Sequence, residues 1–226
     1  LQQTRVSAVI PYFERFMAEL PDAAALATVP EERLLKLWEG LGYYSRARNL
    51  QKAAKVIVSD FGGALPQSYH ALLSLPGIGD YTAGAILSIA FNKAVPAVDG
   101  NVLRIAARLT ACGDNVLDMR TRQHVRDALA AVMPTDRPGD FNQAMMDLGA
   151  MVCTRSKPKC ELCPLNNGCV AYASHSWAQY PGKKPKQTIP ERTGYFLLMQ
   201  HGDEVFLSQR PPVGLWGGLF CFPQFE

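Results

Sequence analysis

The sequence has no long apolar run and no strong charge of one sign. No stretch of its 226 residues approaches the roughly 18 apolar residues that a membrane-spanning helix needs, so we expect no such helix. With 23 basic and 20 acidic residues the net charge is +3, which is compatible with nucleic-acid binding but does not argue for it. The start, Leu-Gln-Gln-Thr, shows neither an initiator methionine nor a signal peptide. A hydrophobic share of 48% with 19% charged residues is ordinary for a globular protein with a core.

Cysteine is also scarce, but four of the six cysteines lie close together, at Cys153, Cys160, Cys163 and Cys169. This spacing is too tight for the disulfide framework of a secreted protein and predicts a metal site in a reducing compartment. Zinc is one candidate, although zinc ribbons usually have two close cysteine pairs and here only Cys160 and Cys163 form one. The compact run favours an iron–sulfur cluster. Cys112 and Cys221 have no partner pattern, and we interpret them as ordinary thiols.

Apolar residues recur at helical spacing through most of the first 175 residues, which predicts a mostly α fold. Pro11 should break or restart the first helix, Gly40 and Gly42 should end the second, and Gly62 should end the third. We expect helices over residues 3–20, 31–38, 46–61, 81–91, 101–110, 120–133 and 141–151, a short one ending at 70–74, and a loop over 134–140.

The composition changes near Tyr180. A linker rich in proline and lysine occupies residues 176–192, and two strands over 193–200 and 204–209 should form a hairpin around His201-Gly202-Asp203. The β segment over 193–226 is too short to close a core of its own.

A tight turn at Leu75-Pro76-Gly77-Ile78-Gly79 separates two of the expected helices. Gly77 and Gly79 leave backbone amides unobstructed in front of a helix N-terminus, which is suited to an anion such as a nucleic-acid phosphate. The alternative is a simple glycine C-cap between two helices. A dinucleotide fingerprint is disfavoured because Thr82 stands where its third glycine belongs, and no Gly-Lys-Ser/Thr of a P-loop follows.

Three motifs together resemble the helix-hairpin-helix DNA glycosylase superfamily with an iron–sulfur cluster. They are Leu-Pro-Gly-Ile-Gly at 75–79, Val-Asp-Gly-Asn at 98–101 and the run of four cysteines. Gly-Leu-Gly-Tyr-Tyr at 40–44 and Phe-Asn-Gln-Ala-Met-Met-Asp-Leu-Gly at 141–149 are similar to the adenine DNA glycosylase family in particular, and the resemblance covers essentially all 226 residues.

The resemblance implies four regions: a helix-hairpin-helix glycosylase domain over 1–152, an iron–sulfur region over 153–175, the linker, and the start of a Nudix-like domain over 193–226. It implies a 4Fe-4S cluster on the four cysteines. The expected activity is excision of adenine opposite 8-oxoguanine or guanine in double-stranded DNA, by a monomer in the bacterial cytoplasm at the nucleoid. A redox or regulatory iron–sulfur protein is a less favoured alternative, because it explains neither Tyr43 nor Asp99.

Cleavage of an N-glycosidic bond passes through a cationic sugar and needs a carboxylate near it and an acid for the leaving base. By resemblance Asp99 is the carboxylate and Asn101 its polar partner; an N-cap role for Asp99 is the simpler interpretation, and the two are compatible. Tyr81 stands where lyase relatives have a nucleophilic lysine, so we expect base removal without efficient strand cleavage. Leu103, where some members have lysine, should be core.

The family's general acid is a glutamate just before the Leu-Gln-Gln-Thr motif, so the chain is expected to be truncated at both ends relative to the family. Three explanations stay open: the chain is a fragment, another group substitutes, or the protein binds DNA without cleaving it. Glu14 and Glu19 are not expected to substitute.

The resemblance also implies residues that read the damaged duplex, since an inaccessible adenine must be flipped out and the gap filled. Gln3 and Tyr43 are expected to enter the base stack, with Thr4 beside Gln3, and Gln143 to line the adenine pocket. Tyr43 could equally be core, and Gln143 a surface residue. Further phosphate contacts are expected from Arg46, Arg48, Arg155 and Lys157, with solvated helix or loop positions as the alternative.

Overall fold

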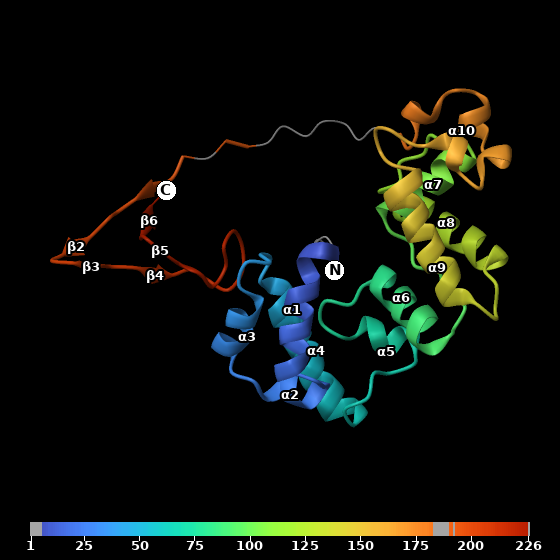
Figure 1. Ribbon diagram of the computed structural model, residues 1–226. Coiled ribbons are helices and arrows are strands. Elements are labelled where there is room, and N and C mark those ends of the chain that lie inside the picture. Colours follow the sequence, from blue (N-terminus) through green and yellow to red (C-terminus); the bar gives the residue numbers. More distant parts are fainter. Residues whose placement is uncertain (1–5, 183–189, 192, 226) are drawn as a thin grey trace. The chain divides into compact units, whose positions relative to one another are not determined.

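The computed structural model describes residues 6–182, 190–191 and 193–225, which fall into two units divided between residues 184 and 185. The first unit is helical, and the second contains short strands joined by loops (Figure 1). The division lies inside the predicted linker. Among the described residues, no helix is long and apolar enough to cross a bilayer.

The first half of the helical unit forms two adjoining cores around one long helix. Its helices are α1 (Val6–Glu19), α2 (Ala23–Thr28), α3 (Glu31–Trp38), α4 (Ser45–Phe61), α5 (Tyr69–Leu73) and α6 (Asp80–Phe91). One face of α4 packs on α2 and α3 through leucines such as Leu26 and Leu34, and another on α5 and α6 through Leu72 and Leu87. Helix α4 ends at Gly62, whose φ of 62° is the left-handed conformation predicted for a C-cap.

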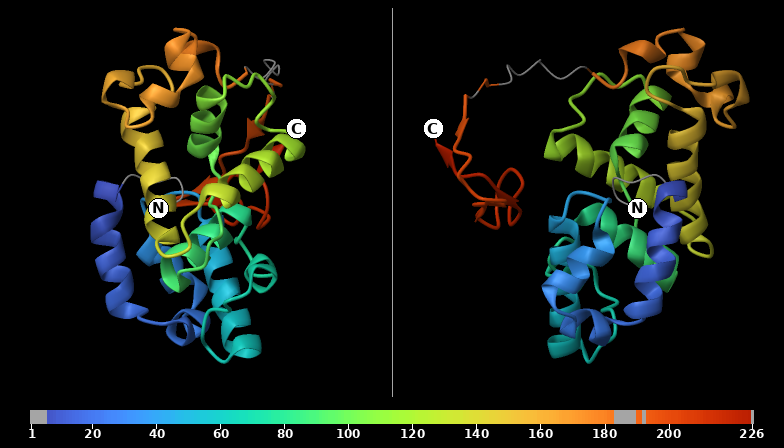
Figure 2. Two further views of the ribbon diagram at one scale, coloured as in Figure 1. Left: turned by 90° about the vertical axis from the view of Figure 1, so that its right-hand side faces the viewer. Right: turned by 60° about the vertical axis from the view of Figure 1, so that its left-hand side comes forward.

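The second half carries the segments that the motif analysis singled out. It contains α7 (Gly100–Leu109), α8 (Met119–Val132), α9 (Pro138–Asp147), a π-helical turn (Leu148–Val152), two 3-10 turns (Cys160–Leu162 and Asn166–Gly168), α10 (Val170–Ala173) and a last 3-10 turn (Trp177–Gln179). The segment around α10 lies at the opposite end of the helical unit from α2 and α4 (Figure 2).

The described residues of the second unit form three antiparallel pairs of two-residue strands. They are β1 (Tyr195–Phe196) with β6 (Gln224–Phe225), β2 (Gln200–His201) with β3 (Glu204–Val205), and β4 (Ser208–Gln209) with β5 (Phe220–Cys221). The pairing of β2 with β3 confirms the predicted hairpin, with Gly202 at a φ of 59°. The paired segments are shorter than the predicted strands.

Two details of the helix prediction were wrong. Helix α1 runs unbroken through Pro11. Both Pro11 and Ser7, whose carbonyl loses its helical donor, are exposed, so water can replace the lost bond. Helix α9 begins at Pro138, inside the expected loop, because proline is well suited to the first position of a helix.

Candidate functional site

Asp99 is fixed at the N-terminus of α7. Its Oδ1 accepts hydrogen bonds from the backbone amides of Asn101 and Val102, both at 2.8 Å, which confirms the predicted N-cap. Its Oδ2 accepts a third bond from Asn101 Nδ2 at 2.9 Å. The helix dipole also favours a negative charge here. Both oxygens of a half-buried carboxylate are thus held in one orientation.

A chain of hydrogen bonds continues from Asn101 to the cysteine segment. The Oδ1 atom of Asn101 accepts from Arg104 Nη2 at 2.9 Å, and the same nitrogen donates to the Gly149 carbonyl at 2.8 Å. Arg104 Nε donates to the Cys153 carbonyl at 2.9 Å. A Cβ on Gly149 would lie 2.6 Å from that of Asn101, so only glycine permits this approach. Sequence reasoning missed Arg104.

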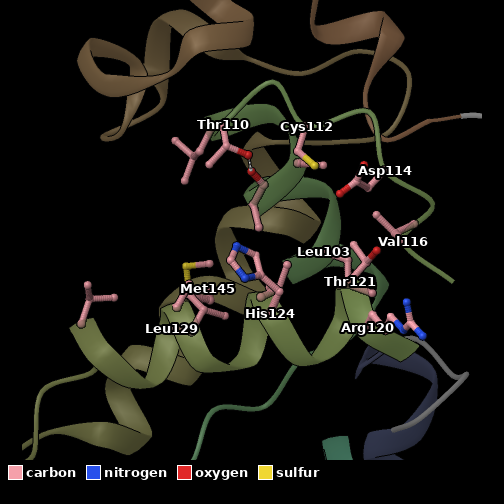
Figure 3. Close-up of a pocket in the computed structure, with 16 residues that line it drawn as sticks. Leu103, Thr110, Cys112, Asp114, Val116, Arg120, Thr121, His124, Leu129 and Met145 are labelled. Atoms are coloured by element: carbon pink, nitrogen blue, oxygen red, sulfur yellow. Dashed lines mark hydrogen bonds between the residues drawn. The ribbon is translucent and has the colours of Figure 1, made fainter. Parts of the chain in front are cut away.

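Tyr81 comes from α6 and lies within the electrostatic influence of Asp99. Burial, and then the charge of Asp99, raises the pKa of its phenol, which therefore stays neutral. Its hydroxyl contacts Met146 Sδ at 2.9 Å. Leu103 is 3% exposed and lines an apolar cavity between α7 and α8, which confirms that it is core (Figure 3).

The turn between α5 and α6 has the predicted form. Gly77 has a φ of 81°, and a Cβ there would lie 2.9 Å from the Cβ of Asn49 on α4. Gly79 is the N-cap of α6, so the first amides of α6 follow directly behind it. This arrangement of glycines and helix N-terminus is suited to holding an anion.

Tyr43 projects from a second turn and is 66% exposed, so it is not a core residue. Its φ of 47° is strained for a residue other than glycine. Arg46 supports the turn: its guanidinium carbon lies 5.7 Å from the Tyr43 ring centroid and 5.3 Å from that of Trp38, and Nη2 donates to the Gly42 carbonyl at 3.3 Å. Arg46 therefore supports the Tyr43 turn through contacts with its backbone and with the Tyr43 ring.

Arg48 and Gln143, which were also predicted to contact DNA, lie on two different helices. Arg48 forms an ion pair with Glu31 at 2.7 Å. Gln143 is exposed and donates to the Gly139 carbonyl of its own helix at 3.4 Å. Gln3 and Thr4 lie outside the described residues.

Asn142, beside Gln143, is a structural residue that sequence reasoning did not single out. It is 2% exposed and joins α6, α9 and the segment that leads to Asp99. Its Nδ2 donates to Ser88 Oγ at 2.7 Å and to the Val95 carbonyl at 2.9 Å, and its Oδ1 accepts from the Ala97 amide at 3.0 Å. The segment before Asp99 is therefore fixed by a buried amide.

The four clustered cysteines surround one small cavity. Burial, and then the charge of neighbouring thiolates beginning with Cys153, raises the pKa of Cys160. Among the described residues, no three His, Cys, Asp or Glu side chains converge closely enough for a single metal ion. Four soft thiolates around one cavity are the ligands that an iron–sulfur cluster takes, one cysteine to each iron.

Arg108 on α7 joins the start of the cysteine segment to Tyr180, which lies beyond its end, and was also missed. It is 3% exposed. Its nitrogens donate to Cys153 Sγ at 3.4 Å, to the Thr154 carbonyl at 2.7 Å and to the Tyr180 carbonyl at 3.1 Å. A fourth bond, of 2.9 Å, reaches the carbonyl of Arg155, whose side chain is exposed, as is that of Lys157. The loop between the first two cysteines is thus anchored by its backbone and presents its cations to solvent.

Comparison with known proteins identifies two matching families. Residues 1–131 match the HhH-GPD superfamily of base excision DNA repair proteins, and residues 153–169 match the iron–sulfur binding domain of endonuclease III. With four thiolates around one cavity, the second match identifies this segment as the site of an iron–sulfur cluster.

Individual relatives agree. The chain is 38% identical over its full length to an adenine DNA glycosylase of Buchnera aphidicola, of which it covers 65%, and 35% identical to the human adenine DNA glycosylase, of which it covers 49%. It thus spans less than two thirds of these relatives. Among solved structures, a thermostable thymine-DNA glycosylase has a TM-score of 0.71 at 28% identity, with 77% of this chain and 80% of that chain covered. A non-covalent endonuclease III–DNA complex has a TM-score of 0.66 at 28% identity, with the same coverage.

Proposed function

Because this chain belongs to the HhH-GPD superfamily of base excision DNA repair proteins, we propose that it is an adenine DNA glycosylase. Its substrate is adenine mispaired with 8-oxoguanine or guanine in duplex DNA, and the reaction is hydrolysis of the N-glycosidic bond. Identities of 35–41% to adenine DNA glycosylases of several organisms support the choice of base. The observation that carries the chemistry is Asp99, whose two oxygens are held by three hydrogen bonds at a helix N-terminus.

Loss of the base leaves positive charge on the sugar, and Asp99 supplies the opposite charge. A preorganised carboxylate stabilises such a transition state because it needs no reorientation as the charge develops. At an effective dielectric constant near 20, two unit charges about 4 Å apart interact by about 4 kcal/mol, which corresponds to a rate factor of about 10³. Asn101 keeps the carboxylate oriented.

The reaction is monofunctional in this proposal. Tyr81 occupies the position of the lyase nucleophile, and a neutral phenol cannot form a Schiff base with the sugar. Asp99 is the carboxylate member of the catalytic pair in this proposal.

DNA contacts come from three separate loops. The amides behind Gly77 and Gly79 hold one backbone phosphate. The exposed Tyr43 wedges beside the lesion when the adenine is flipped out. Arg155 and Lys157 meet phosphates from the anchored cysteine loop. Gln3, Thr4 and Gln143 complete the reading of the mispair.

The iron–sulfur cluster has a structural part in this proposal. The four cysteines bind it, and its bonds to them close the loop that carries Arg155 and Lys157. Arg108 holds the same loop from the protein side through the backbone carbonyl of Arg155.

A single-turnover assay tests the proposal. The protein is incubated with a duplex that contains adenine opposite 8-oxoguanine, and abasic sites are revealed as strand breaks by alkali; an A·T duplex serves as the substrate control. We expect adenine loss from the mispair, no breaks before alkali, and loss of activity in Asp99→Asn. Asp118→Asn is the matched control, because Asp118 caps α8 in the same way and has no proposed catalytic part.

Two results would redirect the proposal. Selective binding of the mispair without adenine loss identifies a recognition protein that lacks catalysis. Equal binding of mispaired and A·T duplexes, with no adenine loss from either, removes the proposal altogether.

A further inference from the structure

A carboxylate stands at the proposed phosphate site itself. Asp80 is the first residue of α6 and directly follows Gly79. A carboxylate in the first helical turn interacts with the same amides and the same end of the helix dipole that would hold a phosphate. An uncompensated Asp80 would therefore repel the DNA backbone.

The carboxylate is compensated by two side chains from elsewhere in the helical unit. Tyr69 of α5 donates its hydroxyl to Asp80 Oδ1 at 2.7 Å. Arg126 of α8 lies 3.4 Å from each carboxylate oxygen, and it also donates to the Tyr69 hydroxyl and lies over that ring, 5.8 Å from its centroid. The three side chains form a closed triangle.

Asp80 stays ionised in this triangle of side chains. The hydrogen bond from Tyr69, and then the contacts with Arg126, lower the pKa of Asp80, so it is ionised at neutral pH. The Arg126 side chain is 22% exposed, against 53% for Asp80. Arg126 is thus the more buried partner of the ion pair, and its hydrogen bond to the Tyr69 hydroxyl fixes its position.

We propose that Arg126, held by Tyr69, neutralises Asp80 and so allows the turn at Gly77–Gly79 to accept a DNA phosphate. Arg126 is a positioning residue that acts through Asp80, and the inference rests on the proposed function. The competing role is mechanical: no side chain of α8 is fully buried, and in this role the triangle serves only to fasten α8 to the turn. That role affects stability, whereas charge compensation affects DNA affinity.

Four variants separate the two roles: Arg126→Gln, Asp80→Asn, their combination, and Tyr69→Phe. Arg33→Gln is the matched control, since it removes one cation from an exposed ion pair with Glu19. Affinity for the duplex with adenine opposite 8-oxoguanine is measured by fluorescence anisotropy at several salt concentrations, together with thermal unfolding of each variant.

We expect Arg126→Gln to weaken DNA binding about tenfold at low salt, as when one phosphate contact is lost, and less as salt increases. Asp80→Asn should bind at least as tightly as the wild type. The double variant should recover to within about threefold of the wild type, because the carboxylate that needed compensation is gone. Tyr69→Phe should fall between the wild type and Arg126→Gln.

Some outcomes overturn the inference without affecting the proposed function. In the first, the wild type binds mispaired DNA, but the double variant binds it no better than Arg126→Gln does. In the second, Arg126→Gln lowers thermal stability and leaves DNA affinity unchanged. Weaker binding by Asp80→Asn alone also overturns it. If the wild type binds mispaired and A·T duplexes equally and removes adenine from neither, the proposed function fails first.

Discussion

Replacing Arg104 with methionine tests whether the placement of Asp99 depends on the hydrogen bonds that reach it from the cysteine segment. Arg104 donates three bonds of 2.8–2.9 Å, to Asn101 Oδ1 and to the carbonyls of Gly149 and Cys153. Methionine has a similar length and fills the same space, but it donates nothing. The change therefore removes the bonds and keeps most of the packing.

The expected loss of stability follows from these bonds. A hydrogen bond to a charged group contributes about 1.5–3 kcal/mol, so three give an upper limit of about 9 kcal/mol. Two effects reduce this figure. Burial lowers the pKa of Arg104, which means that the native state bears a desolvation cost that methionine does not have, and the half-buried site lets water reach some of the acceptors. We expect the free energy of unfolding to fall by about 3 kcal/mol.

Adenine excision should fall as well, because Asn101 loses the partner that orients its amide toward Asp99. Loss of one well-oriented bond to a carboxylate corresponds to about 1.5–3 kcal/mol, or a single-turnover rate about 10–100-fold lower. Urea denaturation and the alkali-revealed assay measure the two effects on the same preparation.

Arg137→Met is the control for this experiment, since the Arg137 side chain is 73% exposed and pairs with Asp140 three residues away. Its stability should change by less than about 1 kcal/mol. The reasoning is refuted if Arg104→Met loses no more stability than this control, or if it keeps full stability-corrected activity at a temperature where it is folded.

Three further predictions concern other buried or charged groups. Asn142→Ala should lower the free energy of unfolding by about 2–4 kcal/mol, because it leaves buried backbone groups unpaired, whereas the exposed neighbour Gln143→Ala should change it by less than about 0.5 kcal/mol; urea denaturation compares them. Arg108→Met should lose iron to a chelator about 10–100-fold faster than the wild type, as measured by released iron, and unchanged retention would refute the anchoring role. The pKa of Asp80 lies below its ordinary value of 3.8, so its contribution to stability is present above that pH and disappears as the pH falls through the lowered pKa; the stability difference between wild type and Asp80→Asn should therefore be present at pH 7 and shrink as the pH falls below about 3.8, as measured by urea denaturation at each pH.

The helices could be predicted because their signals are local. Apolar periodicity and capping residues placed α3, α4, α6, α7 and α8 within one residue at most ends. The errors arose where a local rule depends on the surroundings. A proline inside a helix is disruptive when the freed carbonyl is buried, and α1 leaves it at the surface. The six-residue α2 was not predicted, since so short a helix depends on packing against α4.

The parts of the site that could be predicted are local too. Asp99 caps a helix that starts one residue later, and Gly77 adopts the left-handed conformation that its turn requires. Arg46 shows the limit of such reasoning: sequence indicated a phosphate contact or a solvated face, and it gave no sign that the guanidinium lies over the rings of Trp38 and Tyr43. That placement depends on how a turn folds back on a helix, which spacing does not record.

The buried polar residues escaped prediction because their partners lie far along the chain. Asn142 bonds to residues more than forty positions earlier, and Arg104 and Arg108 to carbonyls more than forty positions later. One sequence signal could have found the two arginines. They stand four residues apart on α7, among residues that otherwise form its apolar face. An arginine on such a face must form hydrogen bonds with buried acceptors, because an unpaired buried charge is costly.

These two arginines on α7 also join the cysteine segment to the helix that Asp99 begins. Helix α7 has 10 residues and is about 15 Å long, with Asp99 at its start and Arg108 near its end. Arg104 bonds to the Cys153 carbonyl and Arg108 to its sulfur, so both anchor the same cysteine. Hydrogen bonds of Arg104 and Asn101 therefore connect that cysteine to Asp99 through two side chains. We therefore expect that loss of iron loosens the hydrogen bonds that orient the Asp99 carboxylate and also disorders the loop that carries Arg155 and Lys157.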